Sequence, residues 1–443
     1  MNGIKIYLSI GITFFLLSSL GAYMSGPAGK DSRGSIREAG FNDASAVSHR
    51  SSTAGINREG DFGIARVVVS IEKTEENVSR LRTLCLDILM DWQGKIYIVA
   101  SAEDLRKLGE AKLVYRDETR NFPPSKPGSL FLQTTRNGAF HSYGELERDL
   151  FALEQAYPHL AKVYDVGDSH EMRNIYALKI SDNVEIEEEG EARAIILGCH
   201  HAREWISVEV PYYIAEHLCA NYAADPLIRS LVDRSEVWIV PLVNPDGLEY
   251  TIHFYRYWRK NTRNNGDGSY GVDPNRNYGF RWGYDDEGSS PDPFSYVYRG
   301  PGSFSEPETR AVRDLIDQKK FEVLISYHSY SQVILYPWGY TAVPSEIDAL
   351  FEEMAGEMAG RMAAVNGRVY AYGAAGSSLY LTNGDTVDWA FGEKGIPAFT
   401  IELPPVDFLL GAFVNPEEDI RPIVNENIPA MLYVIDWAIC NRQ

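Results

Sequence analysis

The chain has 443 residues, which is too long for one ordinary domain and long enough for a large core beside a smaller unit. Hydrophobic residues make up 44% of the chain and charged residues 23%, a balance typical of globular rather than disordered proteins. The 62 acidic residues outnumber the 42 Lys and Arg residues, and the resulting net charge of -20 argues against nucleic acid as a partner.

The first 22 residues have the pattern of a secretory signal peptide. Lys5 precedes an apolar run over residues 6–20, which Gly21 and Ala22 follow as small residues. The run is short for a membrane span, although an uncleaved signal anchor is the alternative, and no later stretch is long and apolar enough to cross a bilayer. We therefore predict a secreted, extracellular protein without a membrane span beyond the signal sequence.

Four cysteines are spread over the chain, at Cys85, Cys199, Cys219 and Cys440. A secretory route permits disulfides, but four cysteines over this length do not make a disulfide-scaffold protein. The sequence leaves open whether Cys199 and Cys219 pair or remain buried thiols.

Changes in composition divide the rest of the chain. Residues 23–63 are rich in Gly, Ser, Asn and charge and predict a flexible linker. Residues 64–117 predict a small α/β domain, with strands over 66–71, 95–100 and 112–115 and helices over 75–92 and 102–109. Residues 118–129 contain Arg, Lys and several prolines and predict an exposed linker, which an activating protease could cut.

Residues 130–443 alternate strand-like and helix-like segments. Apolar strands separated by helices are typical of an α/β fold, here a mixed, mainly parallel sheet flanked by helices. The acidic stretch at residues 185–191 predicts a solvated hairpin tip rather than a binding site. We predict strands over 174–180, 192–197, 237–243, 321–327 and 397–403, and helices over 207–222, 307–318, 347–366 and 425–440.

Three predicted strands lead to side chains that can act together, because functional groups of open α/β sheets gather beyond the carboxyl ends of the strands. The first leads to His201 and Glu204, the second to His328, and the last carries Glu402. Two imidazoles and one carboxylate suit Zn²⁺ with one position left for water. The spacing of His201 and Glu204 has little weight alone, because the chain has nine histidines.

Six short segments occur in order and together strongly resemble the zinc carboxypeptidase A/B family. The resemblance covers residues 130–443, and the preceding α/β unit resembles that family's activation domain. The segments are Gly198-Cys-His-His-Ala-Arg-Glu-Trp205, Asn244-Pro-Asp-Gly247, Trp258-Arg-Lys260, Gly271-Val-Asp-Pro-Asn-Arg-Asn277, Ser326-Tyr-His-Ser-Tyr330 and Phe399-Thr-Ile-Glu-Leu403.

The resemblance implies a secreted metalloprotease, made as a zymogen, that hydrolyses the C-terminal bond of peptides and proteins. It implies one Zn²⁺ per chain, bound by the histidines and glutamate named above, a ligand set that is the family's own. It also implies that Glu402 is the general base, that Arg259 stabilises the oxyanion and that Asp273 orients His201.

The resemblance further implies a clamp for the substrate's terminal carboxylate. Asn275, Arg276 and Tyr380 fall at the family's positions for that clamp, and Arg203 matches a secondary substrate contact. An arginine suits a carboxylate because its planar fork pairs with both oxygens. The alternative for each arginine is a structural ion pair.

The preference for the terminal side chain depends on the pocket floor in this family. Val387 stands where basic-specific members have an acid, which implies a preference for hydrophobic and aromatic residues. Thr400 and Phe408 match residues that line the pocket. Asp385 departs from the family's glycine: a solvent-facing turn is the favoured interpretation, and an inward side chain that accepts Lys or Arg is the alternative.

Three rival hypotheses remain. A catalytically inactive homologue that acts as a binding protein would have lost a metal ligand or the base, and none is missing from the sequence. A zinc amidohydrolase for small acylated amino acids would leave the carboxylate clamp unexplained. The N-terminal unit could also be an independent binding module rather than an inhibitor.

Overall fold

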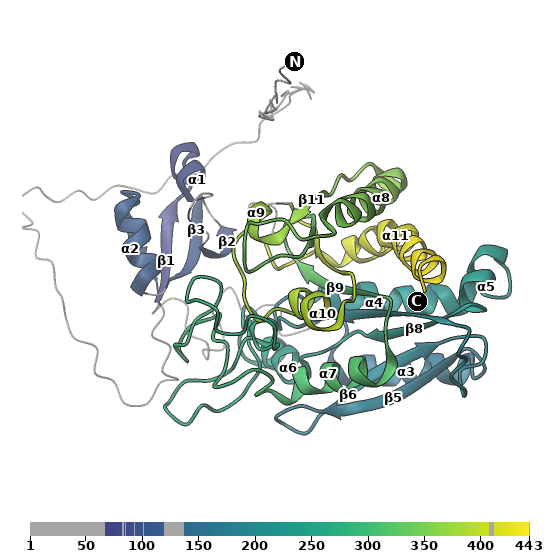
Figure 1. Cartoon of the computed structure of the whole chain (residues 1–443). Helices are drawn as coiled ribbons and strands as arrows, with labels where there is room; N and C mark the ends of the chain where they lie inside the picture. Colours follow the sequence, from purple (N-terminus) through teal and green to yellow (C-terminus); the bar gives the residue numbers. More distant parts are fainter. Residues whose placement is uncertain are drawn as a thin grey trace, which may run out of the picture. The chain divides into compact units, whose positions relative to one another are not determined.

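The computed structural model describes residues 67–118, 137–406 and 412–442, apart from residues 82, 83, 85, 93 and 101 (Figure 1). The predicted signal peptide at 1–22, the linker at 23–63 and nearly all of the linker at 118–129 lie outside the described residues. No helix in the described part of the chain is long and apolar enough to cross a membrane.

The first unit is a four-stranded antiparallel sheet with strand order β2-β3-β1-β4. The central strand β1 is a run of β-branched residues, and the first helix has acidic residues in its first turn and Arg80 in its last turn. Its elements are β1 (Val67–Glu72), α1 (Glu75–Leu81), β2 (Asp87–Trp92), β3 (Lys95–Ala100), α2 (Ala102–Glu110) and β4 (Tyr115–Asp117).

The prediction of one helix over residues 75–92 is wrong. The helix α1 ends at Leu81, and residues 87–92 form β2, which pairs antiparallel with β3 across a turn at Gly94. Gly94 has a φ of 75°, which only glycine adopts readily, so the turn favours the hairpin. Short apolar runs fit helical and strand periods alike, and pairing with β3 decides between them here.

The larger part of the chain forms an eight-stranded sheet with strand order β11-β10-β12-β9-β7-β8-β6-β5. Its central strands β12, β9, β7 and β8 run parallel, and antiparallel pairs join β5, β6 and β10 to them. The predicted mixed, mainly parallel sheet is confirmed. The strands are β5 (Ala161–Asp168), β6 (Asn174–Ile180), β7 (Ala192–Gly198), β8 (Ser235–Val240), β9 (Val323–Ser329), β10 (Val333–Tyr336), β11 (Ala371–Ala374) and β12 (Ala398–Leu403).

Helices cover both faces of this sheet, as alternate residues of β7 demonstrate. Ala194 and Ile196 belong to a core cluster with residues of α3, α4, α8 and α11, whereas Ile195 and Leu197 belong to a second cluster with residues of α7 and α10. The helices α8 and α11 lie side by side (Figure 1). The helices are α3 (Tyr143–Ala156), α4 (Ile206–Asn221), α5 (Pro226–Val232), α6 (Pro245–His253), α7 (Pro307–Lys319), α8 (Asp348–Asn366), α9 (Ala375–Ser378), α10 (Thr386–Lys394) and α11 (Ile420–Cys440).

Two further buried clusters combine residues of the first unit with residues of the larger part of the chain. One contains Val69, Ile71 and other residues of the first unit together with Phe413. The other contains Val68 and Tyr97 together with aromatic residues of the larger part, Tyr257 and Tyr296.

The cysteines in the described residues form no disulfide. Cys199 and Cys219 are buried free thiols, so of the two alternatives the sequence left open, the unpaired one holds. Cys440 is an exposed thiol, and Cys85 lies outside the described residues.

His141 joins the start of the larger part to α4. Its Nδ1 lies 2.7 Å from Glu209 Oε2, its Nε2 lies 3.3 Å from Asp149 Oδ2, and its backbone N–H donates to Glu209 Oε1 at 2.8 Å. Burial alone would lower the pKa of His141, but the hydrogen bond and the charge of Glu209, with that of Asp149, raise the pKa above its ordinary value. The imidazolium therefore stabilises the folded state.

We predict that H141Q destabilises the protein more at low pH than at high pH. Because the folded-state pKa is raised, the stabilisation is fully present below about pH 6.5 and is lost as pH rises through the folded-state pKa. The loss in unfolding free energy should be about 1 to 3 kcal/mol at a pH of about 6 and clearly smaller at a pH of about 9, measured by urea denaturation. H253Q, which changes an exposed histidine paired with Glu249, is the control. An equal loss at both pH values would contradict the prediction.

Candidate active site

Two strand ends bring the predicted metal ligands to one edge of the sheet. Strand β7 ends at Gly198, and the turn that follows carries His201 and Glu204. Strand β9 lies beside β7 in parallel register, with Tyr327 opposite Gly198, and the next residue of β9 is His328. The parallel pairing thus places groups 127 residues apart in sequence next to each other.

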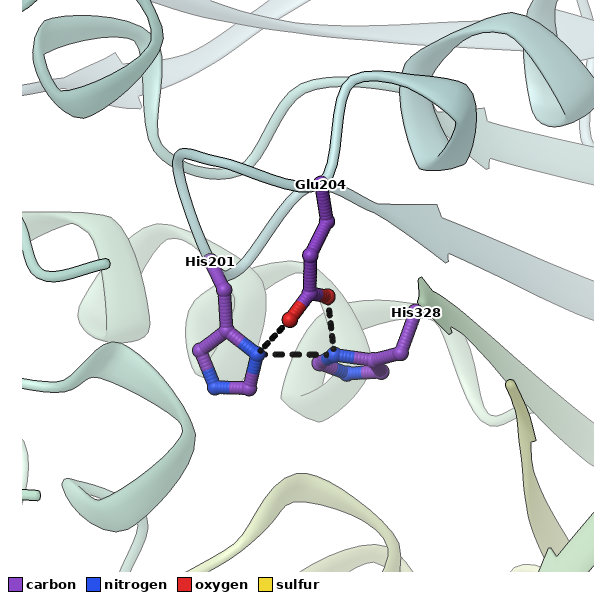
Figure 2. A group of neighbouring side chains, drawn as sticks. All are labelled: His201, Glu204 and His328. Atoms are coloured by element: carbon purple, nitrogen blue, oxygen red, sulfur yellow. Dashed lines mark hydrogen bonds and ion pairs between the residues drawn. The ribbon is translucent and has the colours of Figure 1, made fainter. Parts of the chain in front are cut away.

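The three side chains converge on one point, as Figure 2 shows. His201 Nδ1 lies 2.8 Å from Glu204 Oε1, and His328 Nδ1 lies 3.0 Å from Glu204 Oε2 and 3.1 Å from His201 Nδ1. All three residues are buried, with 4%, 2% and 1% of their surface exposed for His201, Glu204 and His328. The arrangement presents two imidazole nitrogens and a carboxylate to the same small volume.

This donor set fits a zinc ion. Bonds of about 2 Å in tetrahedral geometry separate neighbouring ligand atoms by roughly 3.3 Å, close to the spacing seen here. Two nitrogens and one carboxylate are also the donors that zinc prefers over calcium or magnesium, which take oxygen ligands. Three protein ligands leave room in the coordination shell for water or substrate.

Asp273 connects the metal site to Arg259. Its Oδ1 lies 3.2 Å from His201 Nε2, a close charge contact without good hydrogen-bond geometry, and its Oδ2 accepts from Arg259 Nε at 2.9 Å. Burial alone would raise the pKa of Asp273, but the charges of Arg259 and His201 hold the pKa well below its usual range. Arg259 is buried, and among the described residues its Nη2 has no hydrogen-bond partner, so this N–H group is available to a ligand.

Glu402 lies on β12 directly opposite His328 of β9. Its Oε2 is buried and has no hydrogen-bond partner among the described residues. Burial and the charge of Glu204 raise the pKa of Glu402 well above its ordinary value. The positive charges of Arg259 and Arg276 lower this pKa but do not cancel the rise. A divalent cation held by the triad acts in the same direction as the arginines.

The predicted carboxylate clamp starts in a short 3₁₀ turn, Pro274–Arg276. Arg276 is buried and held by two backbone carbonyls, because its Nε donates to Gly288 at 3.0 Å and its Nη1 to Asn275 at 2.6 Å. The side-chain oxygen of Asn275 accepts from the backbone N–H and the hydroxyl of Thr386 at 2.9 and 2.7 Å. These bonds fix both side chains before any substrate arrives.

Tyr380 keeps 40% of its surface exposed, so only part of the side chain is enclosed. Burial at its hydroxyl end raises its pKa, and the charges that act on the hydroxyl are those of Arg276, Arg259, Glu402 and Glu204. The hydroxyl therefore lies within electrostatic range of the site.

The remaining predicted pocket residues have different surroundings. Val387 is buried in the core cluster that includes α7 and α10, and Thr400 lies on β12 opposite Ser326. The guanidinium of Arg203 lies 3.8 Å from the ring centroid of Phe413. Phe408 lies outside the described residues.

The expected solvent-facing position of Asp385 is wrong. Only 3% of this residue is exposed, because Asp385 is the N-cap of α10. Its Oδ1 accepts from the backbone N–H of Asp388 at 2.9 Å, and its Oδ2 accepts from the hydroxyl of Thr382 at 2.6 Å. An N-cap carboxylate satisfies a helix N–H group that has no partner within the helix.

His200 is a site residue that the sequence-based reasoning missed. Its ring stacks on His328 with centroids 5.6 Å apart, and its Nε2 lies 2.8 Å from Tyr278 Oη and 3.1 Å from Thr386 Oγ1. Burial lowers the pKa of His200 well below its ordinary value, so the ring is neutral at physiological pH. The side chain links β9 to the start of α10, and the adjacent pair of histidines was its signal in the sequence.

Comparisons with known proteins agree with this geometry. A family model described as zinc carboxypeptidase matches residues 146–430. Carboxypeptidase B of Astacus astacus is 36% identical over 307 residues, which cover 68% of this chain and 97% of the relative. Human carboxypeptidase A6 is 29% identical over 395 residues, which cover 83% of this chain and 88% of the relative.

Among solved structures, thrombin activatable fibrinolysis inhibitor (TAFI) is similar with a TM-score of 0.67 and 25% identity. The match covers 85% of this chain and 99% of that one. The family model spans more than half of the chain, and it matches the region that carries the metal-ligand triad. The chain therefore belongs to the zinc carboxypeptidase family and is a metallocarboxypeptidase, a hydrolase that binds one zinc ion and acts on peptide C-termini.

Proposed function

We propose that this metallocarboxypeptidase removes hydrophobic and aromatic C-terminal residues and is secreted as a zymogen. The observation that carries the proposed catalytic roles is the pair of buried groups beside the triad that lack partners in the described residues, Glu402 Oε2 and Arg259 Nη2. One is a proton acceptor and the other is a hydrogen-bond donor, and peptide hydrolysis needs both.

Each group has a distinct task in the proposed reaction. His201, Glu204 and His328 would hold a zinc ion, which would lower the pKa of a water molecule and polarise the substrate carbonyl. Glu402 takes the proton from the attacking water at Oε2 and delivers it to the leaving amine. Arg259 Nη2 donates to the oxygen on which negative charge develops, and Asp273 holds both this guanidinium and His201 in place.

The substrate is held by its free carboxylate. Arg276 is fixed by two of its nitrogens, which leaves its outer Nη2 for a carboxylate oxygen. We assign Asn275 and the Tyr380 hydroxyl as further contacts of the same carboxylate, and Arg203 as a contact to the preceding part of the peptide. A clamp of this kind explains removal of one residue from the end rather than internal cleavage.

We predict that E402Q retains zinc and loses catalysis. Removing the proton acceptor without changing the side chain's shape should lower kcat/KM by a factor of about 10² to 10⁴. Activity is measured on a blocked dipeptide ending in Phe, and metal content is measured on the same sample. One zinc per chain in both proteins excludes a trivial loss of metal. Near-normal activity of E402Q would contradict the assigned role.

The proposed hydrophobic preference rests on the absence of a free acid at two positions. Val387 carries no charge, and both oxygens of Asp385 accept hydrogen bonds within the protein. A substrate guanidinium or ammonium buried there would lack a partner, which is unfavourable. Thr400, and Phe408 from the part of the chain that is not described, are the further residues that we assign to this pocket.

We predict that the processed, zinc-loaded enzyme prefers peptides ending in Phe or Leu over those ending in Arg or Lys. The difference in kcat/KM should be about 10²-fold or more. D385N is the matched variant, because asparagine also caps helices and removes only the charge. Its preference should equal that of the unchanged enzyme. Release of Arg or Lys that disappears in D385N would instead place Asp385 in the pocket.

The zymogen proposal covers the whole chain. We assign residues 1–22 as signal peptide, 23–63 as linker, 64–117 as an inhibitory activation domain, 118–129 as the cleaved linker and 130–443 as the peptidase. Support comes from the clusters that combine Val68, Val69 and Tyr97 with Tyr296 and Phe413. The latter two aromatic rings are also the neighbours of the Arg203 guanidinium.

We predict that cleavage in the 118–129 linker increases activity by about tenfold or more, because only the fraction of molecules with an open site binds substrate. Full-length protein is compared before and after limited trypsin treatment, with R120Q as the control, because Arg120 is the trypsin site of this linker and Lys126 precedes a proline. Full activity of intact protein would refute the inhibitory role.

Secretion is checked by N-terminal sequencing of protein exported from a eukaryotic host, which should begin near residue 23.

A further inference from the structure

The loop between β6 and β7 carries six acidic residues in ten positions, residues 182–191. Two of them are neutralised by lysines from other elements: Glu185 pairs with Lys162, and Glu187 pairs with Lys319. The loop is therefore not a uniformly solvated hairpin tip, since part of its charge is already matched.

Three of the other acids gather at one place. Asp182, Glu188 and Glu191 each offer one carboxylate oxygen, and these oxygens lie within 4.8 Å of one another. Asp182 is exposed, Glu188 is half-buried and Glu191 is buried. Within the described residues none of the three forms an ion pair with a lysine or arginine, so their mutual repulsion is not offset as it is for Glu185 and Glu187.

Glu191 provides a second and independent observation. Only 5% of this residue is exposed, its Oε2 accepts from the Ser181 hydroxyl at 3.2 Å, and its buried Oε1 has no partner among the described residues. Burial together with the charges of Asp182 and Glu188 raises the pKa of Glu191 to about 7. A buried carboxylate oxygen without a partner is costly, and a bound cation removes that cost.

We propose that Asp182, Glu188 and Glu191 form a calcium site separate from the zinc centre. The donors are all carboxylate oxygens, which Ca²⁺ takes in irregular loop geometry at a coordination number of about 6 to 8. The exposed side at Asp182 leaves room for the waters that complete this number. Zinc favours nitrogen and sulfur donors, and Mg²⁺ requires near-ideal octahedral geometry, so both suit this cluster less well.

The site stabilises the fold and takes no part in the zinc chemistry. Glu191 directly precedes β7, whereas His201 follows the other end of that strand. The length of β7 separates the two by about 20 Å. Calcium at this position ties the β6–β7 loop to the start of the strand that leads to the metal ligands.

The test uses full-length, zinc-loaded protein at constant zinc concentration in buffer freed of calcium. Calcium is titrated by isothermal calorimetry, and Tm is followed in parallel. We expect one Ca²⁺ per chain beyond the zinc, with a Kd of about 10⁻⁵ to 10⁻³ M. At about 100 times Kd, Tm should rise by roughly 3 to 8 °C, and Mg²⁺ should give a clearly smaller rise.

Variants separate this site from a general effect of acidic charge. D182N changes an exposed residue whose side chain forms no hydrogen bond or ion pair within the described residues, and it should weaken calcium binding at least about tenfold. E191Q should abolish the response and should not lower Tm in calcium-free buffer, because the substitution removes buried repulsion. E185Q, in the same loop, is the matched control and should respond as the unchanged protein does.

Three outcomes would overturn the proposal. The first is no heat and no change in Tm up to about 10 mM Ca²⁺. The second is an unchanged response in both D182N and E191Q. The third is an equal loss in E185Q, which would show diffuse attraction to an acidic loop. None of these readouts depends on peptidase activity, so they stand whether or not the proposed substrate preference holds.

Discussion

The 3.1 Å separation between the Nδ1 atoms of His201 and His328, with Glu204 in contact with both, is the constraint on which the site depends. It exists because β7 and β9 are parallel neighbours in register, so that two strand ends meet at one edge. The register also continues into β12, which puts Glu402 opposite His328. A shift of one residue in the pairing of β9 or β12 would turn His328 or Glu402 to the other face of the sheet.

Charge balance around the triad follows from that geometry. The carboxylates of Glu204 and Asp273 both contact His201, the charge of Glu204 acts on Glu402, and burial disfavours the charged form of each acid. Arg259 and Arg276 offset part of this charge without using all of their donors. A zinc ion supplies the rest, which explains how three acids can remain charged in one buried site.

Much of this arrangement could be predicted from the sequence. The apolar strands and the groups that follow them gave the sheet and the triad, because strands buried on both faces are continuous in hydrophobicity. The errors arose where tertiary contacts decide local structure. Residues 87–92 form a strand because β3 pairs with them, and the sequence alone fits a helix equally well.

The side-chain environments were harder to predict. Asp385 was expected to face solvent, but the start of α10 takes up its carboxylate as a cap. His200 could not be identified from the sequence because its contacts are with residues distant in sequence. Its ring stacks on His328, and its Nε2 contacts the hydroxyls of Tyr278 and Thr386. The hydrophobic periodicity of the sequence indicates which residues are buried. The hydrogen-bond partners of a side chain can be identified only once the fold is known.

Buried acids in this chain fall into two groups that composition cannot separate. Glu209 and Glu426 are fully buried, and each meets its partners: His141 for the first, and Arg368, Tyr370 and Asn366 for the second. These two acids are structural, because each carboxylate has hydrogen-bond or ion-pair partners within the protein.

Glu402 and Glu191 differ from them in the same way. Each has a buried oxygen without a partner in the described residues and a raised pKa, and each stands beside other carboxylates. Folding does not retain such a group without an opposing interaction, since the unpaired oxygen is costly. In the proposed reaction, the attacking water is the partner of Glu402 Oε2. At Glu191 the same physical argument supports the proposed calcium site, because carboxylate oxygens favour a hard cation.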